Sequence, residues 1–255
     1  DSLVHATRDG RWLGGDRYDA SAERLLREMD AVGDCRACLV AIAGYGENDY
    51  MLELARRHPG KFVPVAGVNP ALAKNEVDVA ATVRKLSALG FAGIKLHPRL
   101  NNYDPLDQRC LAAIREAGES GLVVFLDTLF RRCGIATRHP IDTVDKIINQ
   151  CGHTRLILLH ACGVNLLELF EIGRMHPNLL IDVSFTIIRY AGSSVDQDIA
   201  FLFRMLDERV CVGSDFPQFT PTHLIGRFSE IATGISQDKL DRVLFSNLQS
   251  LFLAK

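Results

Sequence analysis

Short apolar runs recur along this sequence, and several of them end on ionisable side chains. The side chains at these ends are His5, Lys95 with His97, Asp127, His160, Asp182 and Asp215. Imidazole and carboxylate groups together can bind a divalent metal, transfer a proton or stabilise a developing charge. Contact with solvent alone would not require ionisable groups at the ends of so many runs. The pattern predicts a chemical site.

Three of these residues suit acid–base and electrostatic catalysis. A carboxylate such as that of Asp215 can act as a general base. Lys95, or a protonated His160, can stabilise a developing negative charge. Lys95 lies between Ile94 and Leu96, so its ammonium would be buried and would need a partner. We therefore predict Asp215, His160 and Lys95 as catalytic residues.

Basic side chains follow the runs that end near residues 97 and 127. Arg99, Arg131 and Arg132 would lie in loops above the site, next to His97 in the first case. A guanidinium binds a carboxylate or a phosphate through two parallel hydrogen bonds. We predict His97 and the three arginines as substrate-binding residues, and a simply solvated loop arginine is the alternative for each.

The elements that would position these groups alternate along the chain. Eight apolar runs, about thirty residues apart, are rich in Val, Ile and Leu, as are parallel strands buried on both faces. They cover Ser2–Ala6, Ala37–Ile42, Phe62–Val68, Ala92–His97, Leu122–Asp127, Leu156–His160, Leu179–Ser184 and Val210–Ser214. Helical patterns follow them, among them Ser21–Met29, Glu76–Leu89 and a last segment, Gln237–Ala254.

Strands that alternate with helices form right-handed βαβ units. Eight such units in 255 residues predict one α/β domain over residues 1–255, folded as a closed (β/α)8 TIM barrel. An open, doubly wound sheet would usually carry a glycine-rich loop after its first strand, and His5-Ala6-Thr7-Arg8 is not one. In a barrel the carboxyl ends of all strands surround one mouth, where the polar groups should meet.

Four motifs resemble the amidohydrolase superfamily and, within it, the family 2 branch. The motifs are Gly90-Phe91-Ala92-Gly93-Ile94-Lys95-Leu96-His97-Pro98, Leu158-Leu159-His160-Ala161-Cys162-Gly163, Gly213-Ser214-Asp215-Phe216-Pro217 and Phe245-Ser246-Asn247-Leu248-Gln249-Ser250-Leu251-Phe252. They are similar to the family's strand four, strand six, strand eight and closing helix, in the right order over essentially the whole chain.

The resemblance implies one divalent metal, usually zinc. In the family it is held by a His-x-His pair on strand one, by histidines on strands five and six, and by an aspartate on strand eight. His5, His160 and Asp215 match, but Leu3 and Asp127 stand at the other two positions. Because zinc accepts imidazole and carboxylate together, His5, Asp127, His160 and Asp215 are the predicted metal ligands. A metal-bound and a metal-free site both stay open.

The resemblance also implies a function. We expect a hydrolase that cleaves a lactone, ester or amide bond of a small, anionic substrate. Asp215 would activate a water molecule, with or without a bound divalent metal, and Lys95 or a protonated His160 would stabilise the oxyanion. Two alternatives stay open: a non-oxidative decarboxylase, which the same branch contains, and a catalytically inactive barrel that acts as a binding protein. Relatives often pair, so a homodimer is a further expectation.

Composition narrows the partners and the compartment. The net charge of −2 gives no overall field for nucleic acid, and no apolar run approaches the about 20 residues that span a membrane. Seven scattered cysteines, an odd number, favour a reducing cytoplasm over a disulfide framework. Cys35 and Cys38 have CxxC spacing, but they lead into a strand and no second pair completes a zinc site. We expect a cytoplasmic protein whose partner is a small-molecule substrate, with no nucleic acid and no membrane.

Overall fold

The framework of the fold is a parallel sheet in which each strand pairs with the next one along the chain. The computed structural model describes residues 1–131 and 139–253, and this part of the chain contains a seven-stranded sheet. Every neighbouring pair is parallel, so each strand is followed by a crossover. The strands are β3 (Ala37–Val40), β4 (Phe62–Val68), β5 (Gly93–Leu96), β6 (Val123–Asp127), β7 (Leu156–Leu159), β8 (Leu179–Asp182) and β9 (Val210–Cys211).

The first residues of the chain close the ring between β3 and the continuation of β9. Val4 forms isolated parallel bridges to Leu39 on one side and to Phe216 on the other. The His5 N–H also donates to the Phe216 carbonyl at 3.0 Å. The predicted strand Ser2–Ala6 is therefore present only as this short bridging segment, because the chain turns away into a hairpin directly afterwards. The predicted α/β barrel is confirmed.

A glycine allows the closing segment to pass close to the strand beside it. A Cβ atom at Gly213 would lie 2.9 Å from the Leu3 nitrogen and still closer to the Ser2 hydroxyl. Real Cβ atoms essentially never approach other heavy atoms to within 3.0 Å. The close contact between the two segments that close the ring therefore requires glycine at position 213.

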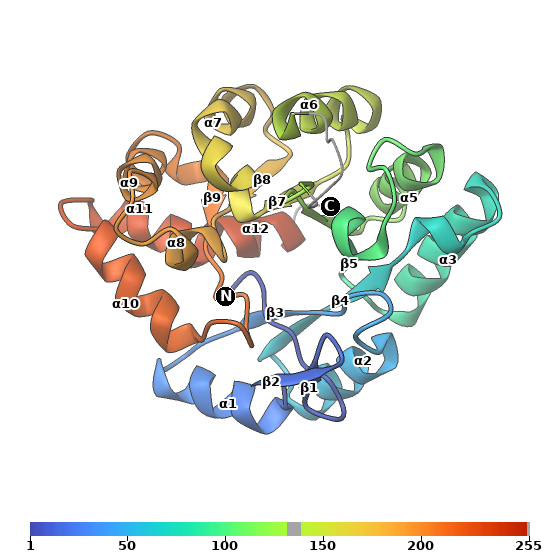
Figure 1. Ribbon diagram of the computed structural model, residues 1–255, viewed down its shortest axis with the longest axis horizontal. Helices are drawn as coiled ribbons and strands as arrows, with labels where there is room; N and C mark the ends of the chain where they lie inside the picture. Colours follow the sequence, from blue (N-terminus) through green and yellow to red (C-terminus); the bar gives the residue numbers. More distant parts are fainter. Residues whose placement is uncertain (132–138, 254–255) are drawn as a thin grey trace.

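Helices form an outer ring around the strands (Figure 1). None of those described is long and apolar enough to cross a membrane. A two-stranded hairpin, β1 (Arg11–Trp12) and β2 (Gly15–Asp19), precedes them. The helices are α1 (Ala22–Ala31), α2 (Asn48–Arg57), η1 (Pro70–Leu72), α3 (Glu76–Leu89), α4 (Pro98–Asn101), α5 (Gln108–Glu119), α6 (Pro140–Cys151), η2 (His160–Asn165), α7 (Leu166–Met175), α8 (Thr186–Arg189), α9 (Val195–Met205), η3 (Asp207–Arg209), α10 (Pro221–Ile231), α11 (Gln237–Asp241), η4 (Arg242–Ser246) and α12 (Asn247–Leu253).

An apolar core fills the interior of the barrel, and α12 covers its amino-terminal end. Leu248, Leu251 and Phe252 pack against the interior side chains, and the Phe252 ring lies 6.3 Å from that of Phe125. The Arg155 guanidinium, directly before β7, donates to the Leu251 carbonyl at 2.7 Å. The interior residues are Leu3, Cys38, Val40, Val65, Val123, Phe125, Ile157, Leu159, Leu180 and Cys211. The polar strand ends therefore face the opposite, carboxyl-terminal mouth.

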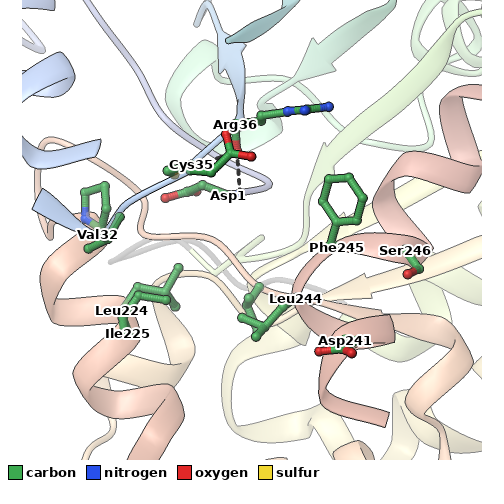
Figure 2. Close-up of a pocket in the computed structure, with 13 residues that line it drawn as sticks. Asp1, Val32, Cys35, Arg36, Leu224, Ile225, Asp241, Leu244, Phe245 and Ser246 are labelled. Carbon is green, nitrogen blue, oxygen red and sulfur yellow. Dashed lines mark hydrogen bonds between the residues drawn. The ribbon is translucent and has the colours of Figure 1, made fainter. Parts of the chain in front are cut away.

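A cavity of about 580 Å³ lies between the start of the chain, the segment before β3, α10 and η4. Figure 2 shows Asp1, Cys35 and Arg36 on one side of it and apolar side chains of α10 and η4 on the other. Cys35 lines the cavity, whereas Cys38 points into the barrel interior, and both are free thiols. Of the predicted site residues that the structure describes, which excludes Arg132, none lines this cavity.

Candidate active site

The predicted catalytic residues lie at the carboxyl ends of the parallel strands. Lys95 is on β5 and Asp127 is the last residue of β6. His160 follows β7 directly. His5 and Asp215 belong to the two segments that close the ring. The fold thus brings residues that are far apart in the sequence to the same mouth.

Asp127 is the centre of a buried cluster of charged and polar groups. Its Oδ2 atom lies 3.2 Å from the Nε2 of His97 and 3.2 Å from the Nε2 of His160. The Lys95 ammonium lies 3.9 Å from the same oxygen. All four side chains are buried, and Oδ2 has no hydrogen bond of regular geometry among the described residues. A single carboxylate oxygen therefore faces three nitrogen atoms.

Burial and charge act in opposite directions on the pKa values of this cluster. Burial lowers the pKa of Lys95 against the attraction of Asp127. Burial also lowers the pKa of His97 to about 3, so this imidazole is neutral at pH 7. Burial would lower the pKa of His160 too, but the close contact with Asp127 and its charge outweigh burial and raise it. Burial would raise the pKa of Asp127, yet the nearby nitrogen groups hold it well below 3.8.

Backbone contacts set the proton position on His97. Its Nδ1 atom accepts a hydrogen bond from the Leu100 N–H at 3.4 Å, at the start of α4. A neutral imidazole carries one proton, so that proton resides on Nε2, the atom that faces Asp127. His97 therefore presents an N–H to the carboxylate without a net charge.

Asp215 and His5 form a second pair, nearer to solvent. His5 Nε2 lies 3.6 Å from Asp215 Oδ1, and the Asp215 side chain is 14% exposed, against 1% for Asp127. Burial would raise the pKa of Asp215, but contact with His5 and the charges of His160 and Lys95 lower it. Asp215 is thus ionised at pH 7 and accessible. Its φ of 58° lies in the left-handed region, where strained residues often serve function.

A left-handed turn carries His160. His160, Ala161, Cys162 and Gly163 have successive φ angles of 64°, 48°, 55° and 64°. Each non-glycine residue in this region costs roughly 1–2 kcal/mol. Buried hydroxyls offset the cost: Thr186 Oγ1 donates to the His160 carbonyl at 2.6 Å, and Thr128 Oγ1, directly after β6, accepts from the Cys162 N–H at 2.8 Å. The turn is therefore held in place by side chains from the segments that follow β6 and β8.

Two aromatic side chains that no sequence pattern indicated also contact histidines of the site. Trp12, from the β1–β2 hairpin, stacks on His5 with ring centroids 4.7 Å apart. Phe185 lies edge-on to His160 at 5.6 Å. Trp12 is the only tryptophan in the chain, and a single tryptophan soon after a strand end is the signal that could have drawn attention to it.

The predicted substrate-binding residues divide into three groups. His97 is buried within the cluster. Arg99, on α4, and Arg131, after β6, are exposed, and their contact with a substrate stays a prediction. Arg132 lies outside the described residues.

The predicted metal ligands do not converge on one point. Among residues 1–131 and 139–253, no group of three or more His, Cys, Asp or Glu side chains is placed to hold a metal ion. The ligands form two separate pairs, His160 with Asp127 and His5 with Asp215. A metal at Asp127 Oδ2 would also lie beside the Lys95 ammonium, 3.9 Å from that oxygen. The residues as placed do not fit a metal ion, and zinc at this site stays a prediction.

Comparison with solved structures places this fold among known barrels. An uncharacterised TIM-barrel protein from Bordetella bronchiseptica superposes with a TM-score of 0.77 at 18% identity, over 92% of this chain and 83% of that one. A 2,6-dihydroxybenzoate decarboxylase from Rhizobium gives 0.69 at 13% identity, over 99% of each chain. An amidohydrolase from Burkholderia multivorans with bound zinc gives 0.68 at 13% identity, over 100% and 99%. At these identities the likeness shows the fold alone.

Sequence comparison reaches further than the fold. No curated protein matches this chain. The family model described as amidohydrolase, however, matches residues 6–247, which is nearly the whole chain and includes every predicted site residue except His5. This chain belongs to the amidohydrolase family.

Proposed function

We propose that the protein is a hydrolase that cleaves a lactone, ester or amide bond in a small anionic substrate. The observation that supports this most directly is the division between the two carboxylates. Asp127 is enclosed by three nitrogen groups, whereas Asp215 is part-exposed and contacts His5 at 3.6 Å. One carboxylate is thus committed to balancing charge, and the other is free to take a proton.

In the proposed reaction, Asp215 removes a proton from a water molecule that attacks the substrate carbonyl. General base catalysis by one carboxylate typically contributes about 10²–10⁴-fold. The Lys95 ammonium and the protonated His160 stabilise the negative charge that develops on the carbonyl oxygen, in a site with little water. Asp127 keeps both cations in place before the substrate arrives.

We assign the preference for an anionic substrate to arginine side chains in the loops above the site. At the mouth, the carboxylates of Asp127 and Asp215 offset the charges of Lys95 and His160, so these four groups together do not attract an anion strongly. Arg99 and Arg131 are exposed and free of the buried cluster, which suits a guanidinium that binds a substrate carboxylate.

The experiment compares wild type with Asp215→Asn on the γ-lactone of α-hydroxyglutarate, on para-nitrophenyl hemiglutarate and on uncharged γ-butyrolactone. We expect wild type to hydrolyse the anionic compounds faster, and Asp215→Asn to lower kcat about 10²–10⁴-fold. Asp238→Asn on α11 is the matched control, because it makes the same change at an exposed site, and it should leave kcat unchanged.

Three other results would redirect the proposal. Release of CO2 from 2,6-dihydroxybenzoate, the compound named for one solved neighbour, would favour a decarboxylase. Equal inactivity of wild type and Asp215→Asn on every compound would favour a binding protein. Elemental mass spectrometry of the purified protein decides separately whether a divalent metal is retained.

A further inference from the structure

The ring of His160 has a second nitrogen, which faces the segment that follows β8. Its Nδ1 atom lies 3.1 Å from the Ser184 carbonyl oxygen and 3.2 Å from the Ser184 hydroxyl oxygen. The carbonyl can only accept a hydrogen bond. The hydroxyl could donate or accept, so the direction of its proton decides what Nδ1 meets.

A buried carboxylate accepts the hydrogen bond that this hydroxyl donates. The Ser184 hydroxyl donates to Asp182 Oδ1 through a short contact, and a hydroxyl has one proton to give. The same oxygen accepts the Ser184 N–H at 3.0 Å and the His160 N–H at 3.3 Å, while Oδ2 accepts the Ser2 hydroxyl. Asp182 is fully buried at the end of β8. The Ser184 hydroxyl is therefore left as an acceptor toward His160.

We propose that Asp182, acting through Ser184, fixes a proton on Nδ1 of His160 and so reserves Nε2 for the reaction. Both Ser184 oxygens near Nδ1 are acceptors, so a proton on Nδ1 can form a hydrogen bond with them. Without that proton, the lone pair of Nδ1 would face the lone pairs of the two oxygens. Nε2 is then the only ring atom that can gain or lose a proton at the mouth, 3.2 Å from Asp127 Oδ2. Asp182 and Ser184 are positioning residues, since they touch His160 and not the substrate.

The hydrogen bonds of Asp182 also tie the ring to its backbone. Asp182 Oδ1 holds both the main-chain N–H of His160 and, through Ser184, its side chain. Thr186, two residues beyond Ser184, holds the main-chain carbonyl of His160. Three alternate residues, 182, 184 and 186, therefore fix the strained turn, but only the first two act on the ring proton.

The first test is a direct reading of the ring protons. Protein labelled with ¹⁵N in the histidine rings is studied by NMR, and the His160 signals are assigned by their loss in His160→Gln. A doubly protonated ring carries a proton on Nδ1 in any case, so the spectra are recorded up to a pH at which one ring nitrogen has lost its proton. We expect Nδ1 to stay protonated and pyrrole-type there in wild type. A pyridine-type, unprotonated Nδ1 would overturn the proposal, whether or not any substrate has been found.

The second test replaces Asp182, which accepts the hydrogen bond from the Ser184 hydroxyl. In Asp182→Ala the Ser184 hydroxyl is free to donate to His160, so a fraction with unprotonated Nδ1 should appear. Asp182→Asn should keep the wild-type signal, because its amide oxygen can replace Oδ1 and its amide group can donate to Ser2. Thr186→Val is the matched control, because it removes a buried hydrogen bond to His160 without touching the ring. An unchanged Nδ1 signal in folded Asp182→Ala would overturn the role of Asp182.

The kinetic arm rests on the proposed function, whereas the NMR arm does not. On para-nitrophenyl hemiglutarate, Asp182→Ala should lower kcat about 10–100-fold with little change in KM, a loss of the size seen when the partner that orients a metal-binding histidine is removed. Asp182→Asn should restore most of kcat. Equal loss in Asp182→Asn and Asp182→Ala, with wild-type NMR signals in both, would show that the effect is not carried by the ring proton and would overturn the proposal.

Discussion

Lys95 and Asp127 face each other in the interior, but the two are not equally replaceable. Among the described residues, the ion-pair partner within 4 Å of Lys95 is Asp127 alone, whereas Asp127 also faces His97 and His160 at 3.2 Å. Removing one partner of a buried ion pair is costly because it leaves the other charge without compensation. The cost should therefore depend on which partner is removed.

We expect Asp127→Asn to lower the free energy of unfolding by about 3 kcal/mol, because it leaves the buried Lys95 ammonium without a counter-charge. Lys95→Met should cost clearly less, since Asp127 keeps its two imidazoles and the methionine fills a similar volume. Urea unfolding at pH 7 measures both. If the lysine variant were the less stable of the two, the electrostatic description of the cluster would be wrong.

At the scale of secondary-structure elements, Asp207 connects the end of the barrel wall to the C-terminal helices. Its carboxylate contacts Lys239 at 3.0 Å and Arg242 at 2.6 Å, and its carbonyl accepts from the Asn247 amide at 2.6 Å. Burial would raise the pKa of Asp207, but the hydrogen bonds from Arg242 and Lys239 lower it. One residue of η3 thus holds α11, η4 and α12 against the sheet.

This contact should be sensitive to acid. Because the pKa of Asp207 is lower in the folded chain than its ordinary 3.8, the unfolded state binds the proton first as the pH falls. The stabilisation is complete above about pH 4 and is lost as the pH falls through the lowered pKa. We expect Asp207→Asn to cost about 1 kcal/mol at pH 7, since solvent screens the pair, and almost nothing at the lowest pH. Urea titrations of both proteins across this range measure the difference, and a constant difference would contradict it.

The elements themselves were largely predictable, because parallel strands buried on both faces leave continuous apolar runs in the sequence. Seven of the eight predicted runs contain a strand of the sheet. The segment predicted over Gln237–Ala254 is instead divided into α11, η4 and α12, since its path depends on contacts such as that of Asp207. The β1–β2 hairpin, with its short and polar strands, carries no such apolar signal.

The sequence allowed us to predict the strand-end residues of the candidate site, but not the residues that form hydrogen bonds to them. His5, Lys95 and Asp215 stand out because an ionisable group that ends an apolar run is unusual. Ser184 and Thr186 do not, because small hydroxyl residues after a strand are common and their meaning comes from His160, more than twenty residues away in the sequence. Hydrogen-bond partners set by tertiary structure leave no local pattern.

At the scale of the whole molecule, the fold depends on the seam where residues 1–5 meet the continuation of β9. Gly213 lies at this seam, and a side chain there would collide with the Leu3 nitrogen. The backbone of residues 1–5 cannot move away without breaking the bridges of Val4, so relieving the clash would cost stability.

We expect Gly213→Ala to lower the free energy of unfolding by about 1–3 kcal/mol, the usual cost of overpacking. Gly226→Ala is the matched control: Gly226 is inside α10 with open space around it, so alanine should add about 0.5–1 kcal/mol. Thermal or urea unfolding of the pair measures the contrast. Similar effects of both substitutions would mean that the seam is not tightly packed.

The same seam has a consequence for biosynthesis. Val4 bridges Phe216, so a nascent chain cannot complete the ring until residue 216 has left the ribosome. Domains often begin to fold while they are translated. Here the earlier strands can associate during translation, but we expect Lys95 to be buried only when the ring closes. We therefore expect water to leave the barrel interior only after residue 216 has been translated and the ring has closed.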